Sequence, residues 1–213
     1  MLQRHAGLYS IDGVALSHLH ADHCLDMCSY WVARRYAPGG PQPAIPVHAP
    51  AGAAERLSRA ADPGADLTSA FTFHALAPET WRIGPFEVTT VRMNHPVETY
   101  GFRFEHRGRV LAYSADTGPT EALIELARGA DLLLSEATFL EEPDLPPDLH
   151  LTGRQAGEHA ARAGARHLVL THIAPGTDKQ RSFAEAEAVY GGPISLAAPG
   201  QEFDLAPAGA LPL

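Results

Sequence analysis

The segment 18–23 reads His-Leu-His-Ala-Asp-His and places four metal-binding side chains within six positions. Imidazole and carboxylate groups are common ligands of divalent transition metals. The apolar run before it, residues 14–17, predicts a short buried strand, and residues 21–36 after it predict a helix. A strand-to-helix turn can aim several side chains at one point, because the backbone on both sides is fixed. The segment therefore predicts a metal site and indicates a metal-dependent hydrolase.

The chain has 213 residues, of which 45% are hydrophobic and 19% are charged. This length suits one sizeable globular domain with its own core, so we expect a single domain over residues 1–213. No run reaches the roughly 18 to 20 apolar residues of a membrane span, and the first residues lack the apolar core of a signal peptide. We therefore expect a cytoplasmic protein. A net charge of −9 argues against tight nonspecific binding to a polyanion.

Two local features outside the motif bear on the metal site and on anion binding. Cys24 and Cys28 lie one helical turn apart, and the apolar residues around them favour burial as free thiols over metal ligation or a disulfide. Arg34 and Arg35 are an adjacent basic pair. We interpret this pair as a solvated helix end rather than as a phosphate clamp.

The remaining pattern begins mainly with strands and then alternates strands with helices. Strands are expected at residues 45–50, 71–73, 86–93, 100–105, 110–114, 131–135 and 167–171. Helices are expected at residues 52–61, 120–128, 152–163 and 183–189, the third capped by Thr152. This order predicts sheets covered by helices, an α/β sandwich.

Three further ligand candidates each follow a predicted strand: His95, Asp116 and His172. Loops at strand ends meet above a sheet, so these side chains can converge with the segment 18–23. Other histidines lack this placement, and we interpret them as structural or solvated: His5, His48, His74, His106, His159 and His167.

The order of four motifs resembles the metallo-β-lactamase fold superfamily. They are His-Leu-His-Ala-Asp-His at 18–23, Asn-His-Pro at 94–96, Ser-Ala-Asp-Thr-Gly at 114–118 and Leu-Thr-His at 170–172. The resemblance runs from about residue 11 to the C-terminus. It implies an α/β fold, a four-layer αββα sandwich that holds two divalent metal ions.

The resemblance also implies how the ligands divide between the two metals. The first metal would be held by His18, His20 and His95, the second by Asp22, His23 and His172, and Asp116 would bridge both. Zinc is the expected metal for histidine and aspartate ligands, with Mn²⁺ and Fe²⁺ as alternatives.

An aspartate rather than a cysteine at position 116 favours the ribonuclease Z-like branch over a true β-lactamase. Residues 135–139, Ser-Glu-Ala-Thr-Phe, are similar to the "HEAT" segment of ribonuclease Z, and residues 150–152 to its "HST" segment. Ribonuclease Z has a histidine where this chain has Ser135, and we find no long basic, glycine-rich arm for tRNA. A tRNA 3′ endonuclease is therefore the alternative rather than the first hypothesis.

The chain is more similar to small bacterial phosphodiesterases that hydrolyse 3′,5′-cyclic nucleotides. This likeness includes residues 2–6, 16–26, 34–36 and 147–151. It implies cyclic AMP or a related nucleotide as substrate and a 5′-nucleotide as product. Two alternatives from other classes stay open: a lactonase or thioesterase on the same scaffold, and an inactive metal-binding module.

The expected mechanism uses two metals about 3.5 to 4 Å apart, which can share a bridging hydroxide that attacks phosphorus. Asp22 is the candidate proton acceptor. His150 is the candidate general acid for the leaving 3′-oxygen, with the orientation of another group as its alternative role. We expect Glu136, Ser135 and Thr171 beside the ligands, where hydrogen bonds would orient them.

Members of the superfamily usually begin with a glycine-rich segment and a strand pair ahead of the first histidine motif. Here that motif starts at residue 18, so we expect these N-terminal strands to be absent. A sheet without them would expose an edge, which favours a homodimer. A truncated chain would also fit the inactive metal-binding module.

Overall fold

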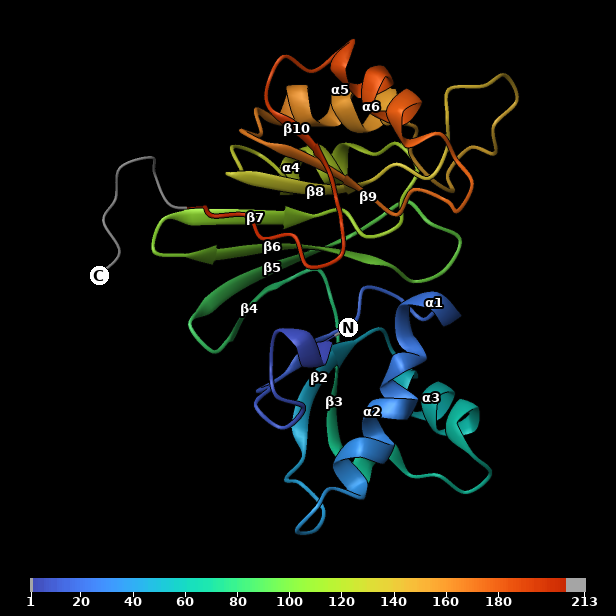
Figure 1. Cartoon of the computed structure of the whole chain (residues 1–213), viewed down its shortest axis with the longest axis vertical. Coiled ribbons are helices and arrows are strands. Elements are labelled where there is room, and N and C mark those ends of the chain that lie inside the picture. Colours follow the sequence, from blue (N-terminus) through green and yellow to red (C-terminus); the bar gives the residue numbers. More distant parts are fainter. Residues whose placement is uncertain (1, 206–213) are drawn as a thin grey trace. The chain divides into compact units, whose positions relative to one another are not determined.

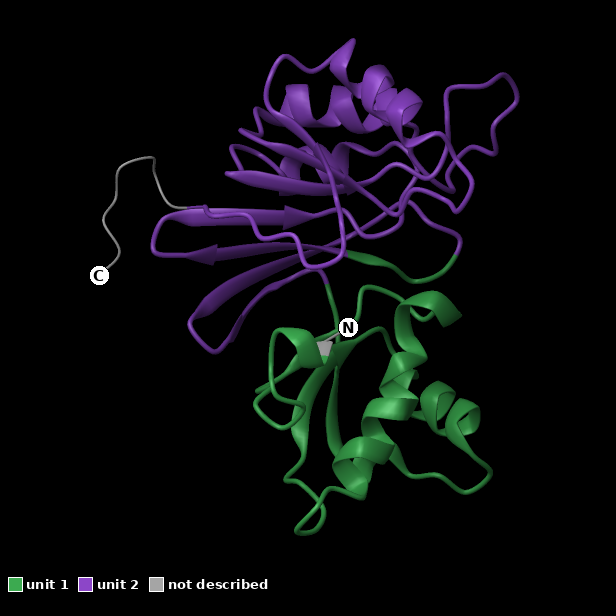
Figure 2. Cartoon of the chain, viewed as in Figure 1, with its two compact units in different colours: residues 1–77, 97–100 green, residues 78–96, 101–213 purple. Residues whose placement is uncertain are grey.

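The computed structural model describes residues 2–205, and the chain forms two compact units (Figure 1). Unit 1 contains the chain up to Ala77 together with Val97–Tyr100, and unit 2 contains Pro78–Pro96 and the chain from Gly101 onward (Figure 2). The chain thus passes between the units three times. The predicted ligands are divided accordingly, with residues 18–23 in unit 1 and the three strand-end ligands in unit 2.

Unit 1 is a parallel sheet with helices packed against it. The strands lie in the order β1 (Val14–Ala15), β2 (Ile45–Ala49) and β3 (Phe71–Ala75). The helices are α1 (Ala21–Cys24), α2 (Asp26–Arg35) and α3 (Ala53–Ala61), with 3-10 turns η1 (Leu2–Arg4) and η2 (Leu67–Ser69). Alternate side chains of β2 enter the core, where Val47 and Leu57 are fully buried. This burial holds the strand-to-helix turn after β1 on a packed base.

The helix predicted over residues 21–36 is two helices separated at Leu25. The amide of Cys28 donates to the carbonyl of Leu25 (3.0 Å), three residues back, so the hydrogen bonding changes between α1 and α2. Cys24 is buried and Cys28 is half-buried, and both are free thiols, as predicted.

The interpretation of Arg34 as part of a solvated helix end is wrong. Its side chain is buried, and its guanidinium donates to the hydroxyl of Tyr30 and the carbonyl of Pro43. Gln42 donates its backbone N–H to the carbonyl of Arg34 (3.0 Å). Arg34 therefore fastens the loop after α2 to the helix, whereas Arg35 is exposed.

Unit 2 is a mixed sheet with three helices on one face (Figure 1). The strand order is β10 (Ile194–Leu196), β9 (Leu168–Thr171), β8 (Leu132–Glu136), β7 (Arg109–Tyr113), β6 (Tyr100–His106), β5 (Phe86–Arg92) and β4 (Thr80–Ile83). The helices are α4 (Glu121–Leu126), α5 (Gly153–Ala163) and α6 (Lys179–Glu187). They pack on the face that carries Ala112, Leu133, Leu168 and Leu170.

Strands β7 to β10 are parallel, whereas β4 pairs with β5 and β6 pairs with β7 in antiparallel fashion. The carboxyl ends of parallel neighbours meet at the same edge of a sheet. Asp116 follows β7, Glu136 ends β8 and His172 follows β9. The topology of unit 2 therefore gathers these three residues at one edge.

The start of α5 agrees with the prediction. Thr152 Oγ1 accepts from the backbone N–H of Gln155 (3.1 Å), and the side chain of Gln155 accepts from the N–H of Thr152 (3.0 Å), which is a capping box. Helix α6 begins at Lys179 rather than at residue 183, because the carboxylate of Asp178 caps the amides that follow it.

Strands β4 and β10 were not predicted. β4 alternates exposed and half-buried residues, and β10 has three half-buried residues. Neither has the apolar density that identifies a strand in a sequence, and both are stabilised by pairing with longer neighbours. Within residues 2–205, none of the helices has the length and apolar character needed to cross a bilayer. The single-domain boundary of 1–213 stays a prediction.

Burial of a neutral histidine predicts how the stability of unit 2 depends on pH. His159 Nδ1–H donates to the carbonyl of Gln155 (2.7 Å), so Nε2 accepts from the N–H of Thr120 (3.1 Å). Desolvation lowers the pKa of His159 below its ordinary value. As pH falls below about 6.5, the unfolded chain therefore binds this proton first and the free energy of unfolding decreases.

We expect His159→Gln to lose less stability than the wild type between about pH 7 and pH 5. Urea unfolding at several pH values measures this difference. His106→Gln, on the half-buried end of β6, removes a histidine outside this contact and is the control. An identical pH dependence in His159→Gln contradicts the assignment.

Candidate metal centre

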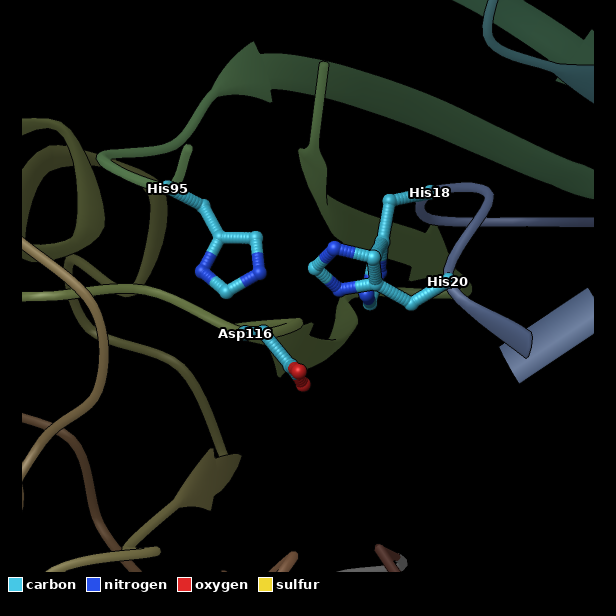
Figure 3. Close-up of side chains that lie close together, drawn as sticks. All are labelled: His18, His20, His95 and Asp116. Carbon is cyan, nitrogen blue, oxygen red and sulfur yellow. The ribbon is translucent and has the colours of Figure 1, made fainter. Parts of the chain in front are cut away.

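The turn between β1 and α1 carries the ligand candidates of unit 1. His18 is fully buried and His20 is half-buried, with their ring centroids 4.8 Å apart (Figure 3). The ring of His23 lies 4.1 Å from that of His18, centroid to centroid. The carboxylate of Asp22 is exposed and lies 3.4 Å from Nε2 of His23. The structure therefore brings the ligand-type side chains of this segment together within unit 1.

Backbone hydrogen bonds fix this turn to its surroundings in unit 1. The N–H of Leu16 donates to the carbonyl of His48 (2.8 Å), and the N–H of Tyr100 donates to the carbonyl of Ser17 (2.9 Å). The hydroxyl of Ser17 lies 3.1 Å from Nδ1 of His18. The ring of His18 is thus oriented by the residue before it, as metal-binding histidines commonly are.

The carboxyl edge of the parallel strands carries the ligand candidates of unit 2. Asp116, His150 and His172 each offer a ligand atom, and these atoms lie within 4.8 Å of one another. Oδ2 of Asp116 is 3.7 Å from Nε2 of His172. His95 follows β5, and its ligand atom also lies within 4.8 Å of that of Asp116 (Figure 3). The structure therefore places His150, the candidate general acid, beside the strand-end ligands that the sequence predicts.

Two histidines at this edge turn Nδ1 toward a protein oxygen that accepts a hydrogen bond. Nδ1 of His95 lies 2.9 Å from the carbonyl oxygen of Leu149, and Nδ1 of His150 lies 2.8 Å from Oε1 of Glu136. A carbonyl oxygen and a carboxylate accept hydrogen bonds, so Nδ1 carries the proton in both rings.

Thr138 orients His172 in the same way. Its hydroxyl donates its one hydrogen to the carbonyl oxygen of His172 (2.8 Å), so Oγ1 accepts from Nδ1–H of the same residue (2.8 Å). In the neutral rings of His95 and His172, Nε2 then has the lone pair that metal binding requires. Their two imidazole nitrogens beside the Asp116 carboxylate suit a divalent transition metal.

Glu136 is the buried acceptor at the centre of this edge. Its Oε1 accepts from the N–H of Thr117 (2.7 Å) as well as from His150, and Oε2 accepts from the N–H of Thr138 (3.3 Å). The side chain is 1% exposed. A buried carboxylate is tolerated only when such donors satisfy it, so Glu136 and its donors hold one another in place.

The other two residues predicted beside the ligands make different contacts. The hydroxyl of Ser135 is buried and donates to the carbonyl of Glu136 (3.0 Å). Thr171 is half-buried, and its carbonyl accepts from the N–H of Ala137 (2.9 Å). Their role in orienting ligands stays a prediction.

Positive φ angles occur at three residues of this edge that are not glycine. They are 54° at Ala115, 60° at Asp148 and 52° at His172. Residues with a Cβ rarely adopt such angles, and each costs of order 1–3 kcal/mol unless the surroundings enforce it. Such strain clusters at functional sites, and here it flanks Asp116 and includes His172.

The chain belongs to the metallo-β-lactamase family. The family model described as a beta-lactamase superfamily domain matches residues 2–173. An uncharacterized protein of Mycobacterium leprae is 42% identical over 210 residues, which are 96% of this chain and 74% of the relative. A ribonuclease Z of Thermobifida fusca is 30% identical over an alignment of 252 positions, which covers 91% of this chain and 79% of that protein.

A solved structure agrees with this membership. The crystal structure of the metallo-β-lactamase fold protein YhfI from Bacillus subtilis matches with a TM-score of 0.83 and 26% identity, over 94% of this chain and 80% of that chain. The predicted α/β fold of this family is confirmed, and the protein is a metal-dependent hydrolase. The histidine and aspartate groups of the edge fit the divalent metal that such a hydrolase requires.

Substitution of Thr138 tests whether its hydrogen bond to Nδ1 of His172 increases metal affinity. Thr138→Val removes the hydroxyl that accepts from Nδ1 of His172, and such losses commonly lower metal affinity about tenfold or more. Thr138→Ser keeps the hydroxyl and is expected to bind like the wild type. Competition with a zinc chelator measures the affinity, and thermal unfolding of the metal-free proteins checks the fold. Equal zinc affinity in Thr138→Val contradicts this role.

Proposed function

We propose that the protein is a phosphodiesterase that uses two divalent metal ions, zinc first among them, to hydrolyse a 3′,5′-cyclic nucleotide. Cyclic AMP is the proposed substrate and a 5′-nucleotide the product. The observation that carries the proposal is the carboxyl edge of the parallel strands in unit 2. There Asp116 lies beside His150, and Glu136 accepts a hydrogen bond from the imidazole of His150. Similarity to a ribonuclease Z, which by its name acts on RNA, supports a phosphodiester as substrate.

The proposed metal ligands come from both units. They are His18, His20, Asp22 and His23 of unit 1, and His95, Asp116 and His172 of unit 2. When bound, two metal ions supply Lewis acidity toward the phosphoryl oxygens. This would let an acidic protein with a net charge of −9 bind a phosphodiester without a large basic patch.

Two side chains support the proposed proton-transfer roles. Glu136 accepts a hydrogen bond from Nδ1–H of His150. Nε2 of His150 is therefore the atom that would carry and donate the proton to the leaving 3′-oxygen. The exposed carboxylate of Asp22, beside His23, is the proposed proton acceptor. The buried hydroxyl of Ser135 donates to the carbonyl of Glu136, which supports His150 rather than Ser135 as the proton donor.

The second candidate is a ribonuclease Z-type endonuclease that acts at tRNA 3′ ends, which the 30% identity to a ribonuclease Z favours. The overall negative charge favours the small substrate over a polyanion. A screen of purified protein against cyclic AMP, bis-p-nitrophenyl phosphate, a precursor tRNA and a lactone separates the candidates. We expect two bound metals per chain and turnover of cyclic AMP that a chelator abolishes. Preference for the lactone or the precursor tRNA contradicts the proposal.

Two substitutions test the assigned roles. Asp116→Ala should abolish measurable turnover of cyclic AMP and reduce the metal content, because a carboxylate that would hold metal is lost. His150→Ala should lower kcat by about 10²–10⁴, the usual contribution of a general acid, while metal remains bound. His106→Ala, on β6, is the control. Near-normal activity in Asp116→Ala contradicts the two-metal site, and an unchanged rate in His150→Ala removes only the acid role.

The homodimer and the cytoplasmic location stay predictions. Among the residues that the structure describes, β1 is one of the two end strands of the sheet in unit 1 and pairs with β2. End strands offer backbone groups to a second chain. Sedimentation of the purified protein is expected to show a dimer, and a stable monomer contradicts it.

A further inference from the structure

The loop before α5 contains a residue with an unusual backbone conformation, Asp148. Asp148 has φ of 60°, and its Oδ1 accepts a hydrogen bond from Nδ2 of Asn94 (2.7 Å). Strand β5 ends at Arg92, and Met93, Asn94 and His95 follow it in that order. Aspartate tolerates the left-handed region better than most residues, and the bond from Asn94 holds it there. A hydrogen bond between two side chains therefore links the segment after β5 to a loop residue 54 positions away.

Gly118, in a third segment of unit 2, contacts both Asn94 and Asp148. Its N–H donates to the carbonyl of Asn94 (2.7 Å), and a Cβ at this position would lie 2.6 Å from Cα of Asp148. Real Cβ atoms do not approach backbone so closely. Gly118, two residues after Asp116, is thus required by the close approach of the loop rather than by its own φ.

Of the two residues after Asp148, Leu149 binds the imidazole of His95, and His150 supplies an imidazole of its own to the candidate metal centre. The carbonyl of Leu149 accepts from Nδ1 of His95, and His150 donates its own Nδ1–H to Glu136. The rings of His95 and His150 lie 5.5 Å apart, centroid to centroid. The position of the backbone over residues 148–150 therefore decides how both rings are oriented.

We infer that Asn94, Gly118 and Asp148 form a positioning latch, which holds the Leu149 carbonyl and the His150 ring in place. The latch keeps His95 as its Nδ1–H tautomer and directs Nε2 of both histidines toward Asp116. The inference rests on the proposed function, in which His95 binds metal and His150 donates a proton. Asn94 and Asp148 are positioning residues, because they act through Leu149, His95 and His150.

Three variants separate the hydrogen bond from the backbone conformation. Asp148→Gly keeps positive φ accessible but removes the acceptor for Asn94, whereas Asp148→Asn keeps both. Gly118→Ala displaces the loop from the other side. Asp144→Gly, in the same loop with φ of 63°, is the matched control.

Two measurements need no turnover. Long-range ¹H–¹⁵N spectra of the metal-free protein report the tautomers of His95 and His150, and chelator competition reports zinc affinity. We expect Asp148→Gly to mix the tautomers of His95 and to weaken zinc binding about fivefold, the factor that one hydrogen bond contributes. Asp148→Asn and Asp144→Gly should match the wild type, and Gly118→Ala should lose at least as much as Asp148→Gly.

Turnover of bis-p-nitrophenyl phosphate and cyclic AMP adds a kinetic readout. In Asp148→Gly we expect kcat to fall about fivefold with KM nearly unchanged, and Asp148→Asn to restore it. Wild-type tautomers, zinc affinity and kcat in Asp148→Gly overturn the latch, even if Gly118→Ala fails to fold. If no variant or wild-type protein hydrolyses cyclic AMP but the tautomer and zinc results hold, the proposed function fails and the latch stands.

Discussion

The buried carboxylate of Glu136 is the interaction on which the candidate metal centre of unit 2 depends. It accepts hydrogen bonds from the amides of Thr117 and Thr138 and from His150, which belong to three separate segments. Its own N–H donates to Ser114 Oγ (2.9 Å). A buried carboxylate destabilises the fold if any of these donors is lost. Glu136 therefore links the loop after β7, the loop after β8 and the loop before α5 to one another.

Hydrogen bonds and backbone strain act together at this edge. His172 adopts a positive φ, and the hydroxyl of Thr138 bonds both its carbonyl and its ring. Ala115 is strained beside Asp116 in the same way. Strain of this kind persists only where the surrounding contacts over-determine the conformation. Such rigidity suits a metal centre, because the ligands need no reorganisation when the metal binds.

The sequence predicted the ligand types and the strand ends that carry them, because both are local patterns. Asp116 lies three residues after the end of β7 and His172 directly follows β9, and the parallel order of β7 to β9 brings them together. The break at Leu25 and the burial of Arg34 were not predicted. Each depends on hydrogen bonds to backbone groups, which the pattern of apolar residues does not reveal.

The sequence by itself determined the family, the α/β fold and which side chains can bind a metal, since motif order and side-chain chemistry are written in it. Only the tertiary structure decided the tautomers of the histidines and the residues that hold them. His95 and the carbonyl of Leu149 are 54 residues apart, and Thr138 and His172 are 34 apart. A backbone carbonyl is the same at every residue, so only folding determines which one meets a given ring.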